Sequence, residues 1–274
     1  MIDFNNKEAD SIYINNKEVQ TITIGGKTAY EKQVDDTDYF YVENTYAGQN
    51  TLTLTTTKGN NLPPQGTYAT SVQYSKDKSN WTTLNLVVGS SNTITMEHGE
   101  KVYMRNDSGK WSTYVSSITK CYTSIKLTNS CSIGGNIKSL LDYNNIESVS
   151  LNAGCFYYLF RSCSGLKTIP QNFFLPTDLA PYCYSGMFSY SGLTTIPQNL
   201  LPATTLAQGC YYEMFYSCGS LTTVPQNLLP ATTLVSGCYG QMFNTCKLLT
   251  NAPTLPATII VNSCYSGMFR NCKK

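Results

Sequence analysis

The stretch Cys210-Tyr-Tyr-Glu-Met214-Phe215-Tyr-Ser-Cys218 decides the fold, because a similar phrase starts five times in the second half of the chain. The starts are separated by 28, 27, 28 and 26 residues. Self-similarity at such a period indicates an array of stacked repeats. We number each repeat from its first cysteine as position 0. These cysteines are Cys155, Cys183, Cys210, Cys238 and Cys264.

The spacing within a repeat predicts a short helix followed by one or two short strands. On a helix at about 100° per residue, positions 0, +1, +4, +5 and +8 share one apolar face. The segment Leu221-Thr-Thr-Val224-Pro225 is typical of a short strand that ends at proline. One unit cannot bury its own core, so we expect residues 155–274 to stack into an α/β solenoid of leucine-rich-repeat type, with a short helix and short strands in each coil.

Eleven cysteines raise the question of a disulfide or metal site, which their spacing does not favour. Cys210 and Cys218 would lie roughly 12 Å apart along a helix, beyond the roughly 7 Å reach of a disulfide. Pairs between neighbouring repeats stay open, although the count is odd. There is no C-x-x-C, and the single histidine, His98, lies outside the repeats. We therefore predict no metal or cofactor, and cysteines that pack as small apolar groups.

Residues 126–154 are predicted to cap the first repeat, with a short helix pattern followed by the alternating strand 146–151. At the other end two alternatives stay open: the last repeat is itself the cap, or another chain covers it. Pro-Gln-Asn triplets at 170–172, 197–199 and 225–227 predict turns whose amide side chains hydrogen-bond between coils.

Residues 35–125 are predicted to form an immunoglobulin-like β-sandwich, because short strand-like segments alternate with turn clusters. Within them, Tyr74-Ser75-Lys-Asp77-Lys-Ser-Asn-Trp81 is similar to the Asp-box hairpin S-x-D-x-G-x-x-W, with Ser79 where glycine is usual. We interpret it as a structural turn with Trp81 in the core. The alternative is that Trp81 and Trp111 stack on sugars.

Residues 1–34 form a third piece with a strand–turn–strand–turn–strand pattern. Asn15-Asn16 and Gly25-Gly26 are candidates for the two turns. Three short strands have too little apolar surface to be stable alone. They either extend the sandwich or form a β-hairpin anchor on another subunit, with residues 35–38 as the linker.

Composition argues against several classes of function. The net charge is +2, so the chain as a whole has no bias toward nucleic acid or anionic membranes. No apolar run approaches the roughly 20 residues needed to insert in a bilayer. The opening residues 1–8 lack the pattern of a secretory signal, which predicts synthesis in a cytosol. Because no phosphate loop or Ser–His–Asp set is recognisable, we predict that the chain is not an enzyme.

Two motifs carry a family resemblance. The C-Y-x-x-M-F-x-x-C repeats and Gly135-Asn136-Ile137-Lys-Ser139-Leu140-Leu141 resemble bacterial leucine-rich repeats of Bacteroides and Treponema surface proteins. They are more similar to a variant found in gut Bacteroides and in crAss-like phage virion proteins. There a β-domain with Y-S-x-D-x-x-x-W precedes a G-N-I-x-S-L-L stretch. The resemblance covers roughly residues 70–272, and only five repeat starts follow, so a long adhesive solenoid is not implied.

The resemblance implies a phage virion structural protein, either a fibre or a head- or tail-decorating protein. Residues 1–34 would then bind other virion proteins, and the repeats would bind a glycan or protein on the host surface. The alternative is a Bacteroides-type cell-surface adhesin, which must be exported. We expect localisation in the virion after assembly in the host cytoplasm, and a homo-oligomer. Fibres are commonly trimeric, so a trimer is predicted.

Ligand contacts on the repeats are expected at outward helix positions and connecting turns. The alternative is that these positions are ordinary solvated surface. The candidate residues are Tyr157, Tyr158, Tyr212, Glu213, Tyr216, Gln241 and Asn244.

Overall fold

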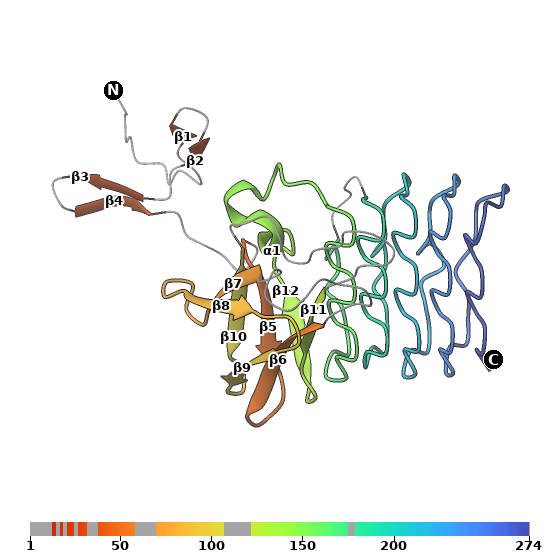
Figure 1. Ribbon diagram of the computed structural model, residues 1–274, viewed down its shortest axis with the longest axis horizontal. Coiled ribbons are helices and arrows are strands. Elements are labelled where there is room, and N and C mark those ends of the chain that lie inside the picture. Colours follow the sequence, from red (N-terminus) through yellow and green to blue (C-terminus); the bar gives the residue numbers. More distant parts are fainter. Residues whose placement is uncertain are drawn as a thin grey trace. The chain divides into compact units, whose positions relative to one another are not determined.

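The computed structural model describes residues 38–57, 70–106, 122–174 and 179–273, together with four short strands within residues 13–31. The chain divides into two compact units, Met1–Asp35 and Asp36–Lys274. Figure 1 labels the strands and the short helix. In these described parts, no helix is long and apolar enough to span a membrane.

The first unit contains two antiparallel hairpins. The first pairs β1 (Tyr13–Ile14) with β2 (Lys17–Glu18), and the second pairs β3 (Thr21–Ile24) with β4 (Lys27–Glu31). The register of the second hairpin shifts between Ile22 and Thr23. The sequence predicted three strands here, and the structure has four. The predicted turns at residues 15–16 and 25–26 lie outside the described residues.

Two antiparallel sheets form the first part of the second unit. One has five strands in the order β12-β5-β10-β7-β8, and the other has three in the order β11-β6-β9. Their bounds are β5 (Phe40–Asn44), β6 (Asn50–Thr57), β7 (Thr70–Ser75), β8 (Thr82–Leu86), β9 (Ser91–Met96), β10 (Lys101–Arg105), β11 (Tyr122–Lys126) and β12 (Cys131–Gly134).

Alternating side chains explain how these strands bury a core. Along β6, Leu52 and Leu54 are fully buried while the residues between them face outward. Leu54 lies opposite Ile125 of β11, and Leu52 lies opposite Ile94 of β9. Apolar residues at every second position of a strand share one face of the sheet. The apolar residues of this sheet therefore gather on one face.

The strand order differs from that of the predicted immunoglobulin-like sandwich. In an immunoglobulin sandwich the first of the seven strands joins the second, fifth and fourth, and the last joins the third and sixth. Here the first strand of the unit, β5, pairs with β10, and the seventh, β11, pairs with β6. The immunoglobulin-like prediction is therefore wrong in topology. Alternation fixes which face of a strand is buried, but it does not specify the neighbouring strand.

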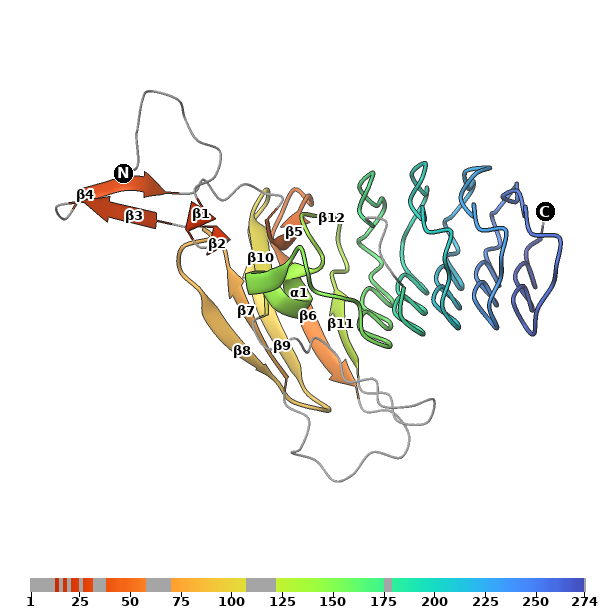
Figure 2. The same ribbon diagram turned by 90° about the horizontal axis from the view of Figure 1, so that it is seen from above.

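The predicted solenoid of helices and strands is also wrong. Residues 155–174 and 179–273 contain no helix and no strand, only turns and one isolated bridge between Cys131 and Leu166. Across the unit, helical structure is described only at α1 (Ser139–Asp142) and the 3-10 helix η1 (Tyr143–Asn145). The stretch 146–151, predicted as a strand, is turn and irregular backbone. The repeats instead form coils that lie side by side in a row (Figures 1 and 2).

An alternation of backbone hydrogen bonds builds these coils. In the first repeat, the amides of Tyr157 and Leu159 donate to carbonyls three residues back, at Gly154 and Phe156. The alternate amides donate to the next repeat instead. The amide of Phe156 donates to Cys183 O at 2.9 Å, and that of Tyr158 donates to Ser185 O at 3.1 Å. A helix would satisfy every amide within itself. Here half of the amides in positions 0 to +8 hold neighbouring repeats together.

A left-handed residue at every fourth position produces this geometry. In the third repeat, φ is +57° at Gly209, Glu213 and Ser217, which are positions −1, +3 and +7. Such a period of four places positions 0, +4 and +8 in one row and +1 and +5 in another. Both rows are buried in the inner repeats, as the helical interpretation also required. Burial alone therefore could not distinguish a period of 3.6 from a period of four.

Two ladders of stacked rings fill the interior of the repeats. At position +5, the rings of Phe160, Phe188, Phe215, Phe243 and Phe269 stack with centroids 5.5, 5.8, 5.6 and 5.7 Å apart and nearly parallel planes. Position +1 forms a second ladder, from Phe156 to Tyr265, at 5.8 to 6.0 Å. Each of the first four repeats therefore contributes two buried aromatic rings to the core, beside buried Cys and Met or Leu side chains.

The first repeat is covered by β11 and the turn that follows it, so contacts with this repeat begin before residue 126, where the predicted cap starts. The amide of Ile125 donates to Leu159 O at 2.6 Å, and the amide of Gly165 donates to Leu127 O at 2.9 Å. The α1 helix is attached to the five-stranded sheet, because the Ser139 hydroxyl accepts from the amide of Phe40 and donates to Met104 O. The sheets and the repeats therefore share a continuous core.

Candidate binding face on the repeats

Positions 0, +1, +4, +5 and +8 point into the interior of each coil, so the outward side chains come from positions +2, +3, +6 and +7, although Ser185, Ser189 and Asn244 at these positions are buried. In the first three repeats these outward positions bring together aromatic and charged groups, joined by one residue of β11. We call this set the tyrosine face. It consists of Tyr122, Tyr158, Arg161, Tyr190, Glu213 and Tyr216.

Arg161 lies between two rings of this face. Its guanidinium carbon is 4.5 Å from the ring centre of Tyr158 and 5.5 Å from that of Tyr190. Its Nη1 donates to the hydroxyl of Tyr122 at 3.4 Å. A guanidinium over an aromatic face is held by cation–π attraction and keeps donors available at its edge. Arg161 is therefore an oriented cation rather than a free surface arginine.

Tyr190 is the most exposed ring of the face, at 46%. It packs against Tyr216, with ring centroids 5.4 Å apart and planes inclined by 55°. Partial burial, followed by the neighbouring Tyr216, raises the pKa of Tyr190, so its hydroxyl is protonated at neutral pH. The exposed ring can accept a flat apolar surface, such as one face of a sugar.

Glu213 supplies the carboxylate of the face. One of its oxygens accepts a hydrogen bond from the Tyr158 hydroxyl at 3.0 Å. An ionised carboxylate has acceptor capacity for several donors. The pair leaves this face with an oriented acceptor near the arginine donors, which suits a ligand rich in hydroxyl groups.

Three further candidates form a network that adjoins the tyrosine face, because burial and then the neighbouring Glu213 carboxylate raise the pKa of Tyr212. Gln241 donates through Nε2 to the Tyr212 hydroxyl, and its Oε1 accepts from Asn244 Nδ2 at 3.0 Å. Asn244 Oδ1 in turn accepts from the Thr245 hydroxyl at 2.8 Å. The ring of Tyr212 packs over Gly240, where an added Cβ would lie 2.8 Å from it. These groups satisfy one another, which indicates a structural role between the third and fourth repeats.

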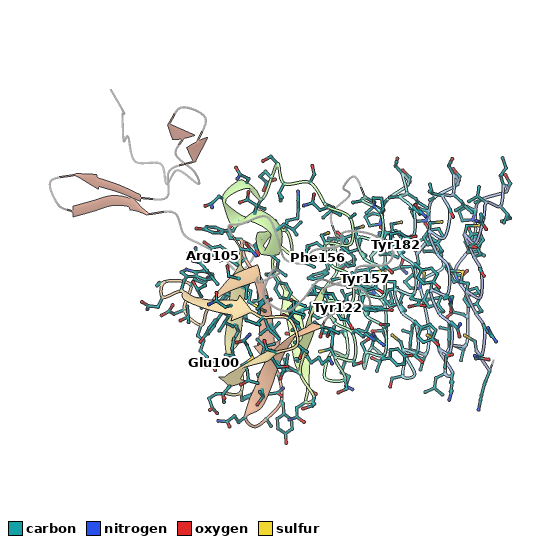
Figure 3. All side chains as sticks on the ribbon, in the orientation of Figure 1. Glu100, Arg105, Tyr122, Phe156, Tyr157 and Tyr182 are labelled. Atoms are coloured by element: carbon teal, nitrogen blue, oxygen red, sulfur yellow. The ribbon has the colours of Figure 1, made fainter. Side chains whose placement is uncertain are left out.

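The structure therefore divides the seven predicted residues. Tyr158, Glu213 and Tyr216 belong to the tyrosine face, and Tyr212, Gln241 and Asn244 belong to the adjoining network. Tyr157 is buried, at 8% exposure, with its ring 4.0 Å from that of Tyr158. Figure 3 labels Tyr157 beside Tyr122, whose ring centre is 5.6 Å away.

Sequence reasoning missed Tyr122, Arg161 and Tyr190 as site residues. The signal for Tyr190 was present, because position +7 otherwise carries Ser162, Ser217, Thr245 and Asn271. A tyrosine among small polar residues marks an exception to the repeat. Tyr122 could not be found in this way, because it reaches the face from β11, outside the repeats.

The Asp-box-like turn has a structural geometry. Asp77 accepts from the amides of Ser79 and Asn80 at 2.9 and 2.8 Å, and from the Ser75 hydroxyl at 2.9 Å. Hydrogen bonds from Asn80, Ser79 and Ser75 hold the pKa of Asp77 well below its usual range. The indole of Trp81 donates to Lys78 O at 3.0 Å. This is the predicted turn.

Trp81 is half-buried rather than in the core, and its ring face is occupied. The guanidinium carbon of Arg105 lies 3.8 Å from its ring centre and 4.1 Å from that of Tyr143 (Figure 3 labels Arg105). Tyr39 packs edge-on against the same indole at 4.9 Å. This arrangement disfavours the alternative in which Trp81 stacks on a sugar. Trp111 lies outside the described residues.

The cysteines at position +8 take part in the hydrogen bonding between repeats. The thiols of Cys218, Cys246 and Cys272 donate to the position +5 carbonyls of the preceding repeats, at 3.2, 3.1 and 3.1 Å. Within the described part of the chain ten cysteines are reduced thiols, and nine of them are buried. Burial raises the pKa of Cys155 and Cys210 to about 12.

Amide side chains also bond between repeats, as the Pro-Gln-Asn triplets predicted. Asn227 donates to Asn199 Oδ1 at 2.9 Å, and Gln226 donates to Ala252 O at 3.1 Å. Asn199 is left-handed, with φ of +55°. These residues stabilise the stack on the side of the connecting turns.

The sheets, the stacked turns and the tyrosine face define a repeat protein with an exposed aromatic surface. No family model, curated protein or solved structure gives a significant match to this chain. Among the residues that the structure describes, no three His, Cys, Asp or Glu side chains gather as a metal site would require.

Proposed function

We propose that this chain is a phage virion structural protein, a fibre or a head- or tail-decorating protein, whose repeats bind a glycan on the host surface. The observation that carries the binding proposal is the tyrosine face. An exposed ring, an oriented guanidinium and a carboxylate lie together there, at Tyr190, Arg161 and Glu213.

The chemistry of these groups fits a carbohydrate. The C–H faces of a pyranose ring pack against an aromatic ring, and vicinal hydroxyls pair with planar arginine and carboxylate groups. A net charge of +2 provides little attraction for a polyanion, so a neutral or weakly acidic glycan is favoured. Stacked coils hold the three groups on a rigid scaffold, which limits the entropy lost on binding.

The virion proposal rests on the family resemblance of the repeat phrase and of residues 135–141, together with a separate first unit. Met1–Asp35 forms its own contacts, as an anchoring segment would. We propose that residues 1–34 bind neighbouring virion proteins and that the assembled protein is a trimer. Size-exclusion chromatography with light scattering tests the trimer. A mass of a single 30.3 kDa chain would contradict it.

Glycan binding is tested with two variants and a matched control. Tyr190→Ala and Arg161→Ala should each weaken binding on a glycan array or by calorimetry at least about tenfold, which corresponds to roughly 1.4 kcal/mol. Tyr46→Ala removes a tyrosine of similar exposure, 43%, on the sheet part of the unit and should leave binding unchanged. Equal affinities for all three variants would reject the tyrosine face as the binding site.

Mass spectrometry of purified virions tests the assignment to a virion. The chain should be present at a fixed copy number, together with the other structural proteins. Recovery of the chain in the envelope of a bacterial cell, and not in virions, would instead support a cell-surface adhesin.

A further inference from the structure

We call positions 0 to +8 of each repeat its turn segment, and the backbone hydrogen bonds between these segments all run in one direction. Within this segment, the amides at positions +1, +3, +5 and +7 of one repeat donate to the carbonyls of the next. Examples are Phe215 N to Met242 O at 3.0 Å and Phe243 N to Met268 O at 2.9 Å. The carbonyls at the intervening positions are used inside each repeat, as in Cys246 N to Phe243 O. The side of every turn segment that faces the next repeat, which we call its trailing side, therefore presents amide donors.

The last repeat carries these donors without acceptors. Its carbonyls at Cys264, Ser266, Met268 and Arg270 accept from the preceding repeat. The amides that would donate onward are those of Tyr265, Gly267, Phe269 and Asn271. Across the described residues no backbone carbonyl accepts from these four amides.

We call the stretch that connects one turn segment to the next a leg. The backbone hydrogen bonds between legs run in the opposite direction. There the amide of Thr222 donates back to Thr194 O at 3.3 Å, and the amide of Thr250 donates back to Thr222 O at 2.9 Å. On this side the trailing edge ends in the carbonyl of Thr250. The edge of the last repeat thus combines a row of donors on the turn segment with an acceptor on the leg.

Apolar side chains that are buried in the inner repeats are exposed at this edge. Ile260 is 66% exposed, whereas its counterparts Leu206 and Leu234 are 9% and 7% exposed. Leu255 is 39% exposed, whereas Leu229 is at 1%. The rings of Tyr265 and Phe269 end the two aromatic ladders, and both are half-buried.

We propose that this edge is a docking surface for a polypeptide segment that itself carries the C-Y-x-x-M-F-x-x-C phrase and its leg. Such a segment would present alternate carbonyls to the four amides and rings to Tyr265 and Phe269. Its position +8 thiol would donate to Phe269 O, and its threonine would donate to Thr250 O. An ordinary β-strand would match the amides but not the rings, the thiol or the leg.

A second copy of this chain does not fit the edge. If two such edges met, turn segment against turn segment, donors would face donors. If a turn segment met a leg, only one or two carbonyls would face four amides. The first repeat of another copy is covered by β11, whose Ile125 donates to Leu159 O. The edge therefore selects a repeat segment whose acceptor side is open.

The first test adds a peptide with the sequence of residues 210–237 to the full chain and follows amide hydrogen exchange. Exchange at Tyr265, Gly267, Phe269 and Asn271 should slow by at least about tenfold. The control peptide carries Met214→Asp and Phe215→Asp, which remove two of its core side chains, and should have no effect. Protection of these four amides at rising protein concentration without peptide would show self-pairing and overturn the proposal.

Protein variants and a tethered form complete the test. Ile260→Asp with Phe269→Asp should abolish protection by the peptide, whereas Val87→Asp, at a 48% exposed site on the sheet part, should not. Joining residues 210–237 to the end of the full chain removes the cost of bringing two molecules together. If the four amides remain unprotected in that tethered chain, the edge does not accept a repeat.

Discussion

The hydroxyl of Tyr158 donates a hydrogen bond to the carboxylate of Glu213, 3.0 Å away, although 55 positions separate the two residues. They belong to the first and third repeats, and the side chain of Tyr158 crosses the second. It does so over Gly186, the residue of the second repeat at the same position +3. The repeats therefore interact beyond nearest neighbours at this face.

Gly186→Ala should disrupt this crossing. An added Cβ would lie 1.9 Å from Cε1 of Tyr158, and φ of +62° is unfavourable for alanine. We expect a loss of about 2–4 kcal/mol in the free energy of unfolding, measured by urea denaturation. Gly219→Ala is the control, because nothing lies within 4 Å of its Cβ. Equal stability of the two variants would contradict the packing of Tyr158 over Gly186.

A double-mutant cycle should detect coupling between the two ends of the crossing. Tyr158→Phe leaves the ring and removes the donor, and Glu213→Ala removes the acceptor. A hydrogen bond to a charged acceptor that is partly solvated predicts a coupling of about 1 kcal/mol. The measurement is the free energy of unfolding of the two single variants and the double variant. Strict additivity would show that the bond contributes nothing to stability.

Buried thiols should make the protein sensitive to alkaline pH. Burial raises the pKa of Cys210 to about 12 and that of Cys218 to about 11, from 9.0. A raised folded-state pKa gives stability that is complete below pH 9 and is lost as pH rises toward 11 or 12. At pH 10.5, Cys210 alone should lose about 2 kcal/mol of stability relative to neutral pH.

The check is chemical denaturation at pH 7.5 and 10.5 with a reductant present. Cys218→Ser should reduce the pH dependence, because it removes one titrating thiol. Serine fits this position, since Ser191 occupies it in the second repeat and lies 3.4 Å from the Cys218 sulfur. A wild-type chain that is equally stable at both pH values would be inconsistent with buried thiols.

Removing residues 1–34 should abolish incorporation into virions while the second unit stays folded. The second unit, Asp36–Lys274, holds nearly all of the described core, so its circular dichroism and unfolding midpoint should change little. The measurement is the copy number of the truncated chain in purified virions. Normal incorporation of the truncated chain would refute the anchor.

The repeats and their core could be predicted from the sequence, but the backbone that carries them could not. Positions 0, +1, +4, +5 and +8 are apolar in either a helix or a series of turns. The decision depends on the left-handed residues. At positions +3 and +7 these residues include Tyr158, Glu213 and Gln241. Only glycines at these positions would have indicated a left-handed conformation from the sequence. Stacking between repeats stabilises the left-handed residues, and a single repeat does not reveal that contribution.

The candidate site was predicted only in part, for a related reason. Tyr158, Glu213 and Tyr216 were found because outward positions follow from the period. Arg161 was missed because its role depends on two rings from different repeats, Tyr158 and Tyr190. Asn244 and Gln241 were placed in the site because no pattern in the sequence shows that they bond to each other.

The left-handed residue at every fourth position also limits how this protein can diversify. Branched apolar side chains such as valine and isoleucine fit poorly at φ near +60°, so positions +3 and +7 disfavour these types and hold residues such as Tyr158, Glu213 and Ser217. Positions +2 and +6 have no such restriction, and they already hold residues as different as Tyr212, Gly240, Arg161 and Ser189. A change of ligand can therefore draw on all four outward positions, but a contact made by valine or isoleucine would be expected only at +2 or +6, while the coil itself stays unchanged.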